Sequence, residues 1–467
     1  MKKNTVTPFV LKSVEMKGFR LFSRLTGQLH PKLTVLVAPN SGGKTAFLDG
    51  VAHILKSFLT GYVGKLSKFD KYRNTAINGA ESVDLSLLGR IDLLKDYFSL
   101  SLENEPVSDL TIKIQSGHTS QYFEPWSSTN DGLYGLFATG PAISLSKMFQ
   151  TQTNSAYNLK LPLLAYFTAN RRVVSLKDID SFDHDFELSK DQAFLALLPC
   201  EGLTNFDEWL RERAINALEK RLEFEETGNT SVPEPDDHLK AVSVVLAKML
   251  SEVVDIKDVK YFSSSKSIQA VRSNGDRLDI SQLSHGAKSI LTIAAEIAMH
   301  CCALNPRLKQ HAPIKTPGII LIDEIDLHLH PKWQQHVLGD LQECFPCMQF
   351  IVSTHSPAIL TTVRKENIRE INVDPETGEA TVLEPLNRSY GESSGDLQET
   401  IMGVPARPNN PSVQALKKYL NWAENGDLDE NKSSERADLE TEWGIEHMDL
   451  LTADMIIKRR NLLSEKK

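Results

Sequence analysis

Short apolar runs of strand length recur along the chain and suggest an ordered sheet. They cover 33–37, 163–167 and 318–322, and a similar segment covers 349–354. The run at 318–322 is continuous rather than alternating, which is typical of a parallel strand buried on both faces. Further strands are expected at 10–19, 83–88 and 110–114.

Apolar residues at helical spacing predict several helices between and after these strands. Such patterns cover 46–59, 206–226, 411–422 and 448–463, and a long helical pattern runs from 288 through 303. The stretch 116–162 is rich in Ser, Thr, Gly and aromatic residues, so loops and short helices are expected there. The acidic stretch 424–442 is predicted to be a solvated linker, with partner binding as the alternative.

A loop of small residues connects the strand at 33–37 to the helix at 46–59 and ends in Gly-Lys-Thr. Backbone N–H groups of such a loop can surround phosphates, while the lysine reaches the outer ones and the hydroxyl of Thr45 can bind Mg²⁺. The pattern has Ala38 where a first glycine is usual, so the turn there must tolerate a Cβ atom. The residues expected to bind ATP are Asn40, Ser41, Gly42, Gly43, Lys44 and Thr45.

Groups suited to phosphate chemistry follow two later strands and precede one helix. Asp323 and Glu324 follow the strand at 318–322; Asp323 is expected to hold the metal and Glu324 to orient or deprotonate the attacking water. His355 follows the strand at 349–354, where it can bond the γ-phosphate or water. Ser284 precedes the long helix and, with the helix N-terminus, can form an anion site.

Together these four elements resemble the ABC-type ATPases of the branch that contains the SMC, RecF and OLD-like proteins. The resemblance implies an α/β fold: an ABC-type P-loop ATPase head with a mixed sheet flanked by helices and an antiparallel β subdomain. It also implies a head-to-tail homodimer, or a higher homo-oligomer, in which Ser284 and Gly286 of one subunit close over ATP and Mg²⁺ held by the other. Glu324 is then the catalytic base and His355 the switch. His285 and Ala287 depart from the usual signature sequence of that branch.

Composition fits a globular protein: the chain has 467 residues, 41% hydrophobic and 24% charged. No signal-peptide core follows the start, and five cysteines without a zinc pattern suit a reducing compartment, so we expect a cytoplasmic protein without a membrane partner. The net charge of −9 argues against a surface that binds DNA everywhere, although local basic clusters at 65–73 and 171–172 leave room for contacts.

The chain is interpreted as a head split by a compact insertion. The expected parts are 1–115 (the lobe with the phosphate loop), 116–262 (a mainly helical insertion), 263–400 (the lobe with the signature, the paired acids and the switch histidine) and 401–467 (a helical, partly acidic docking tail). Sustained heptad repeats are missing from the sequence, so long coiled-coil arms are not expected.

The segment 323–331 resembles the D-E-x-x-x-H-L-H-P string of OLD-like and Septu-type ATPases, and 403–408 resembles a stretch that follows the head in Septu-type relatives. Overall, the chain looks most like the ATPase subunit of the Septu anti-phage defence system, whose partner is an HNH endonuclease. This implies a Mg²⁺-dependent ATPase that regulates the nuclease, meets DNA through the complex and has no nuclease site of its own.

Two other interpretations of the whole chain stay open. It could be a RecF-like or SMC-like DNA-repair ATPase, or a scaffold that binds ATP with little hydrolysis. His328 and His330 also permit a metal site, although H-x-H spacing without a further ligand more often belongs to a loop that packs on a neighbouring subunit.

Overall fold

The structure is a computed structural model of the whole chain, and it describes residues 9–39, 42–60, 86–93, 101–102, 105–106, 109–117, 135–139, 160–170, 206–227, 236–426 and 432–464. The basic clusters expected at 65–73 and 171–172 lie outside these residues. The chain divides into two compact units, Met1–Glu392 and Ser393–Lys467. Each unit is described by itself.

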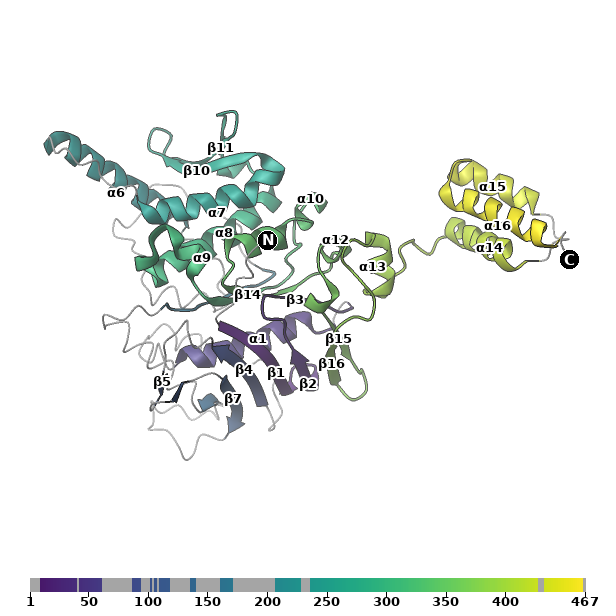
Figure 1. The fold of residues 1–467 in the computed structure, drawn as a ribbon, viewed down its shortest axis with the longest axis horizontal. Coiled ribbons are helices and arrows are strands. Elements are labelled where there is room, and N and C mark those ends of the chain that lie inside the picture. Colours follow the sequence, from purple (N-terminus) through teal and green to yellow (C-terminus); the bar gives the residue numbers. More distant parts are fainter. Residues whose placement is uncertain are drawn as a thin grey trace, which may run out of the picture. The chain divides into compact units, whose positions relative to one another are not determined.

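The first unit is built on one mixed sheet of eleven strands (Figure 1), ordered β8-β7-β4-β1-β2-β16-β15-β3-β14-β13-β9. Its strands are β1 (Phe9–Phe19), β2 (Phe22–Gln28), β3 (Leu33–Val37), β4 (Ser86–Leu93), β7 (Asp109–Gly117), β8 (Gly135–Thr139), β9 (Leu163–Phe167), β13 (Gly318–Ile322), β14 (Met348–Ser353), β15 (Ile368–Val373) and β16 (Glu379–Leu383). The mixed sheet confirms the predicted α/β fold class.

One half of this sheet is parallel and fully buried. Strands β9, β13, β14 and β3 pair in parallel, and every residue of β3, β9, β13 and β14 is buried. Continuous apolar sequences are the expected composition for strands covered on both faces. Because the strands run in one direction, their carboxyl ends gather polar residues at a single edge.

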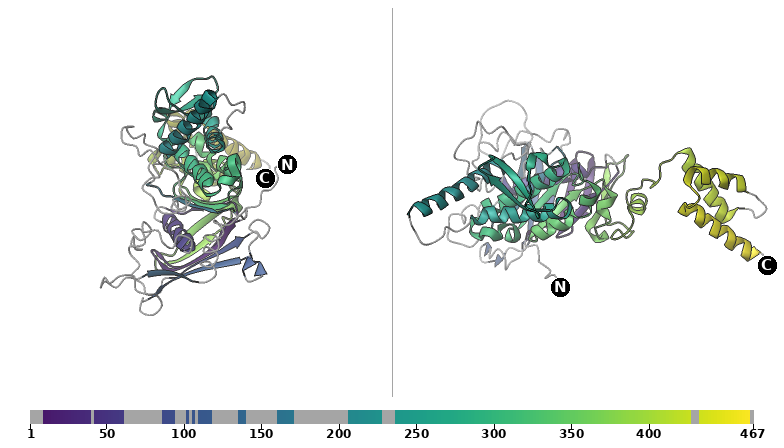
Figure 2. Two further views of the ribbon diagram at one scale, coloured as in Figure 1. Left: turned by 90° about the vertical axis from the view of Figure 1, so that its left-hand side faces the viewer. Right: turned by 90° about the horizontal axis from the view of Figure 1, so that it is seen from above.

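The other half is antiparallel except for the parallel pair β2 and β16, and it curls around the helix α1 (Lys44–Thr60) (Figure 2). This helix contacts β1, β4, β7 and β8 as well as β13 and β14. Gln349 connects the two halves from inside the core. Its side chain accepts a hydrogen bond from Leu11 N at 2.8 Å and donates to Leu11 O at 2.9 Å, beside a register shift in β1. The amide therefore satisfies backbone groups that the irregular strand leaves unpaired.

Helices cover the opposite face of the parallel strands (Figure 1): α6 (Phe206–Thr227), α7 (Asp237–Val254) and α8 (His285–Leu304). Among the described helices, only α8 has the length and apolar composition of a membrane span, but 89% of its most apolar window is buried inside the fold. It contacts α6, α7 and β9, as a core helix does. The shorter elements are η2 (Ile280–Gln282), η3 (Pro306–His311), α9 (Ala312–Lys315), α10 (Pro331–Gln334), α11 (Val337–Cys344), α12 (Pro357–Leu360) and η4 (Lys365–Asn367).

Beyond the main sheet lie a three-stranded antiparallel sheet and a two-stranded one. Their strands are β10 (Ile256–Phe262), β11 (Ser267–Arg272), β12 (Arg277–Asp279), β5 (Ser101–Leu102) and β6 (Glu105–Pro106). The three-stranded sheet leads through η2 directly into α8, so it precedes Ser284 and Gly286 at the start of that helix.

The range 116–262, expected to be mainly helical, also contributes strands to the main sheet. Within it, β8 pairs with β7, and β9 pairs with β13 at the edge of the parallel half. The buried run of β9 brings Phe167 O within 2.8 Å of Asp323 N. This range therefore supplies part of the head itself, beside the helices α6 and α7.

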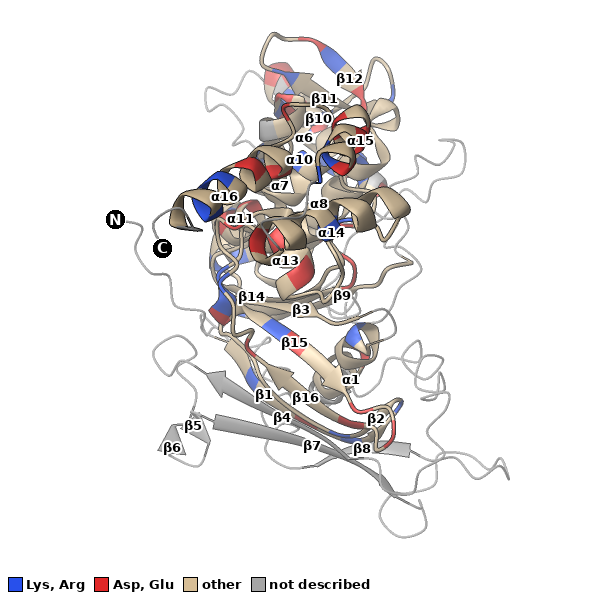
Figure 3. Ribbon diagram, turned by 90° about the vertical axis from the view of Figure 1, so that its right-hand side faces the viewer, with Lys and Arg blue, Asp and Glu red and all other residues tan. Residues whose placement is uncertain are grey.

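The second unit contains α13 (Ser394–Thr400), α14 (Pro411–Asn425), α15 (Ser433–Trp443) and α16 (Met448–Ser464). The last three share their own core, formed by Leu416, Tyr419, Ala423, Leu439, Leu450 and Ala453. Asp449 and Asp454 lie in the first half of α16, and Lys458, Arg459 and Arg460 in the second; Figure 3 shows these two stretches in red and blue.

The acidic stretch 424–442 is only in part the linker that its charge predicts. Its second half forms α15, because Leu439 and Trp443 provide an apolar stripe that packs into the helical core. Arg436 compensates the negative charge: it pairs with Glu440 at 2.8 Å and with Asp454 of α16 at 2.9 Å. The high negative charge of this stretch therefore led to the wrong expectation for its second half, where two apolar residues and one arginine stabilise a helix.

Candidate functional site

The phosphate loop follows β3 and turns tightly before α1. Gly42 N donates to Pro39 O at 2.9 Å, and a Cβ atom on Gly42 would lie 2.7 Å from the Cβ of Ala38. Ala38 has no positive φ, so its side chain is compatible with the turn, and the missing Cβ at Gly42 gives it room. Gly43 has φ +89°, a left-handed conformation that favours glycine. Asn40 and Ser41, also expected to bind ATP, lie outside the described residues.

Lys44 begins α1 and is buried against the loop. Its Nζ donates to Ala38 O at 2.8 Å. Burial lowers the pKa of Lys44, whereas the carboxylates of Asp323 and Glu324 act in the opposite direction. The ammonium group is thus held by backbone carbonyl oxygens near the acids at the same sheet edge. From there it can exchange the carbonyl oxygens for phosphate oxygens as hydrogen-bond acceptors.

Thr45 and Asp323 meet although they come from opposite halves of the sequence. The Thr45 hydroxyl donates to Asp323 Oδ2 at 2.8 Å, and Ser353 Oγ donates to the other carboxylate oxygen. Asp323 is buried and Thr45 is exposed at the rim. A hydroxyl and a carboxylate are hard oxygen donors of the kind that Mg²⁺ prefers, so this pair fits the metal that accompanies a nucleotide.

Glu324 occupies an unusual backbone conformation next to Asp323. Its φ is +48°, which is strained for a residue with a Cβ atom, and its N–H donates to Ser353 Oγ at 2.8 Å. Ile325 N in turn donates to Ser353 O at 3.0 Å. Ser353 therefore fixes the turn that carries the half-buried Glu324.

Asp326 connects this turn to His355, the residue expected to act as the switch. Its Oδ1 accepts a hydrogen bond from the Thr354 hydroxyl at 2.6 Å and another from His355 N at 3.2 Å. The His355 side chain is exposed. The loop after β13 and the loop after β14 are consequently held together by one carboxylate oxygen.

Ser353 and Asp326 are the site residues that sequence reasoning missed. A signal for Ser353 was present: β13 and β14 pair Ile322 with Val352, so the next residues along each strand, Asp323 and Ser353, are neighbours. A polar residue at the end of a buried strand, aligned with an acid at the end of the next, is therefore informative. Asp326 depends on the loop conformation, for which periodicity gives no signal.

Ser284 and Gly286 lie at the N-terminus of α8, as the sequence predicts. Ser284 caps the helix: its side chain accepts from Ala287 N at 3.2 Å, and the residue is exposed. Gly286 packs against the loop after β13, since a Cβ atom there would lie 2.6 Å from His328 O. Within one chain, Gly286 contacts the loop that follows Glu324, and Ser284 contacts its own helix.

His328 and His330 have structural partners that account for their spacing. His330 caps α10 by accepting from Lys332 N at 3.2 Å, while the His328 ring lies 6.2 Å from the His285 ring. Within the part of the chain that the structure describes, no group of three or more His, Cys, Asp or Glu side chains could hold a metal ion. His328 therefore belongs to the contact between α8 and the loop after β13, and His330 to the start of α10.

A partly buried polar contact connects α1 to β9. Tyr166 donates to Asp49 Oδ1 at 2.8 Å, and Arg20 forms an ion pair with the same carboxylate. Burial raises the pKa of Asp49, and burial with the Asp49 charge raises the pKa of Tyr166. The contact fixes the helix that carries Lys44 and Thr45 relative to the edge strand.

The geometry combines a phosphate-binding loop, a buried lysine, two oxygen donors for a metal and a carboxylate beside them. This arrangement can bind a nucleoside triphosphate and position water for attack on its terminal phosphate. The fold and this site define a P-loop ATPase of the ABC type.

Within that class, the chain belongs to the AAA_21 family, whose description reads "AAA domain, putative AbiEii toxin, Type IV TA system" and which matches residues 33–361. It is 27% identical to the "Retron Vc95 probable ATPase" of Vibrio cholerae serotype O1 biovar El Tor, over 91% of this chain and 85% of that protein. It is 29% identical to the "Septu protein PtuA" of Bacillus thuringiensis, over 88% of both chains.

Among solved structures, the chain is similar to an SMC head bound to the C-winged helix domain of ScpA. The TM-score is 0.42 at 15% identity, and the match covers 80% of this chain and 97% of that chain.

Proposed function

We propose that this chain is the ATP-binding and hydrolysing regulatory subunit of an anti-phage defence complex. In this proposal it controls an associated HNH-type nuclease through ATP-dependent dimerisation of its head. The convergence of Lys44, Thr45, Asp323 and Glu324 at one sheet edge carries the ATPase part. The similarity to PtuA and to retron ATPases supports the defence part.

Each site residue has a role that follows from its position. Lys44 binds the outer phosphates, and Thr45 with Asp323 holds Mg²⁺, which neutralises phosphate charge when bound. Glu324 orients and deprotonates the attacking water, because its turn places it beside the metal-binding acid. His355 contacts the terminal phosphate or the water from the neighbouring loop.

Dimerisation supplies the rest of the site in this proposal. Ser284 is exposed at the N-terminus of α8, where the helix dipole and free N–H groups favour an anion. We assign Ser284 and Gly286 to the nucleotide of a second subunit, so that ATP holds two heads together. Since Gly286 also contacts the loop after Glu324, closure and hydrolysis would be coupled.

We assign nuclease docking to residues 401–467, which lie within the second unit. Its three-helix core is separate from that of the head, and α16 leaves Met448 and Met455 exposed on its surface. In this proposal cutting belongs to the nuclease, and the chain meets DNA through the complex.

Co-purification with the product of the adjacent reading frame tests this proposal. We expect a stable complex by size exclusion with light scattering. We also expect DNA cleavage by the wild-type complex to depend on ATP, and this ATP dependence to differ in the complex with Glu324→Gln. An isolated chain that dimerises with ATP and binds DNA only in the presence of ATP, without a partner or cutting, would instead support a DNA-repair ATPase.

A further inference from the structure

An open surface pocket of about 530 Å³, called the cavity below, lies at the sheet edge opposite the nucleotide site. It is formed by the start of α7, by η3 and by the end of α9, from which the chain continues into β13. Asp323 follows the other end of that same strand. The cavity is therefore separated from the nucleotide by the length of β13.

The lining of this cavity is strongly basic. Four of its eight residues are Lys or Arg and one is acidic, in a chain whose net charge is −9. Lys309 forms an ion pair with the acid, Asp237, at 3.3 Å, which reduces the charge of one cation. The complete lining is Asp237, Lys240, Arg307, Leu308, Lys309, Gln310, His311 and Lys315.

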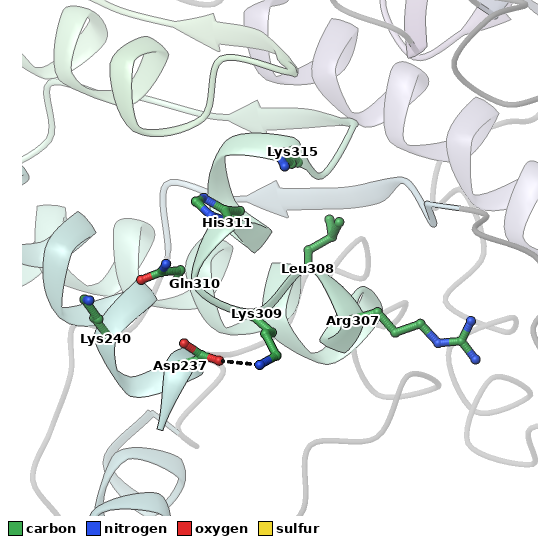
Figure 4. Close-up of a pocket in the computed structure, with 8 residues that line it drawn as sticks. All are labelled: Asp237, Lys240, Arg307, Leu308, Lys309, Gln310, His311 and Lys315. Atoms are coloured by element: carbon green, nitrogen blue, oxygen red, sulfur yellow. Dashed lines mark ion pairs between the residues drawn. The ribbon is translucent and has the colours of Figure 1, made fainter. Parts of the chain in front are cut away.

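The side chains come from α7, η3 and α9. Figure 4 shows Lys240 and Asp237 of α7 across from Gln310 and Lys309 of η3, while Arg307 extends away from them. Asn305 stabilises the base of this region: its side chain accepts from Leu161 N at 2.8 Å and donates to Leu161 O at 2.9 Å. The cations are thus displayed on a well-anchored segment.

Positive charge continues past the cavity along the same edge. Lys160 precedes β9, as Lys315 precedes β13. The pKa of Lys160 is lowered by burial and by the charge of Lys315, whereas Cys347 acts in the opposite direction. Cations gathered in one place repel each other unless an anion neutralises them. This arrangement is favourable when several negative charges bind together.

We infer that this basic cavity binds the phosphate backbone of a nucleic-acid strand. A strand offers successive phosphates over the distance across which these cations are spread, whereas one phosphate would meet only part of them. The lining contains no Phe, Tyr or Trp on which a base could stack, so contacts to phosphate without sequence preference are expected. The inference does not depend on the ATPase assignment.

Fluorescence anisotropy of a labelled single-stranded oligonucleotide with the full-length protein tests this site. The variant Lys240→Gln/Lys315→Gln is compared with Lys257→Gln/Lys266→Gln, which removes the same charge from exposed positions in β10 and in the turn between β10 and β11. We expect the cavity variant to weaken binding about ten-fold, and to make the slope of log affinity against log salt shallower by about 1.4 for two lost contacts. ATP turnover without nucleic acid should equal that of the wild type, which separates this site from the proposed function.

Several outcomes would overturn the inference. They are the absence of wild-type binding at low salt, or equal affinity of the cavity variant and the control variant. Displacement of the oligonucleotide by inorganic phosphate at constant ionic strength would identify a site for a free anion. Stronger displacement by polyglutamate than by unlabelled oligonucleotide would identify a site for an acidic protein segment.

Discussion

The hydroxyl of Thr45 donates a hydrogen bond to Asp323 across 2.8 Å, although 278 positions separate the two residues. The contact exists because β3 and β13, with β14 between them, run in parallel and end at one edge. Thr45 lies in the first turn of α1, directly after the phosphate loop, and Asp323 directly follows β13. Their contact joins both halves of the nucleotide site.

Replacing Asp323 tests the metal role of this pair. Asp323→Asn keeps an oxygen that can accept from Thr45 but removes the negative charge that favours Mg²⁺. We expect ATP turnover to fall by about 100-fold and to require more Mg²⁺ for half-maximal rate. A Mg²⁺ titration of turnover measures this, with the exposed Asp438→Asn as the matched control. Equal Mg²⁺ dependence of wild type and Asp323→Asn would contradict the role.

Much of this site could be predicted because its chemistry follows buried strands. Apolar runs at 33–37 and 318–322 end in the phosphate loop and in Asp323, and parallel strands bring such ends together. The resemblance to ABC-type ATPases supplied the mixed sheet. The Ala38 departure also resolves as expected, since the turn accommodates its Cβ atom.

What the sequence did not indicate depends on contacts between distant segments. Ser353 acts through its register with Asp323, and Asp326 through a loop whose backbone conformation periodicity does not encode. The charge of 424–442 concealed α15, whose stability comes from packing of Leu439 and an ion pair of Arg436 with Asp454. Local patterns do not report such long-range compensation.

Asp326 is expected to act as a positioning residue for His355. Asp326→Ala removes the acceptor for Thr354 and for His355 N, so the switch loop loses its fixed geometry. We expect kcat for ATP to fall about ten-fold while KM changes little, because the phosphate loop stays intact. Steady-state kinetics measure both constants.

The conservative variant separates positioning from simple loss of stability. Asp326→Asn retains one oxygen that can accept both hydrogen bonds, and its kcat should lie between those of wild type and Asp326→Ala. If the alanine variant raised KM and left kcat unchanged, the positioning role would be wrong.

Gly286 is expected to be essential for the contact between α8 and the loop after β13. In Gly286→Ala the new methyl would lie 2.6 Å from His328 O, so backbone must shift. We expect a loss of about 1 to 3 kcal/mol in the free energy of unfolding. Gly339→Ala is the control: its Cβ meets nothing within 4 Å in the helix α11, so stability should hold or rise. Urea denaturation compares them, and equal stability of wild type and Gly286→Ala would disprove the close contact.

His300, on α8, should make stability depend on pH. Burial lowers its pKa from 6.5 to about 4, so the folded state keeps it neutral while the unfolded state takes up a proton below pH 6.5. Stability from this residue is complete above its unfolded pKa and declines as pH falls from 6.5 towards 4. Between about pH 7.5 and about pH 5.5 the loss is about 1 kcal/mol.

Urea denaturation at the two pH values measures the free energy of unfolding, and the change between them is compared for the wild type and the variants. His300→Gln should lose less stability on acidification than the wild type, whereas exposed His336→Gln should behave as the wild type does. An identical pH dependence in wild type and His300→Gln would show that the histidine is not held neutral.

ATP binding and turnover by Glu324→Gln, measured together on the purified chain, test the central claim most directly. The variant keeps Lys44 and the metal-binding pair but loses the group that activates water. We expect it to retain ATP while turnover falls about 100-fold to 1,000-fold below the wild type, in contrast to Lys44→Ala, which should bind ATP weakly. Wild-type turnover by Glu324→Gln would contradict the catalytic role. Wild-type turnover no faster than that of the variant would show a scaffold that binds ATP without hydrolysing it.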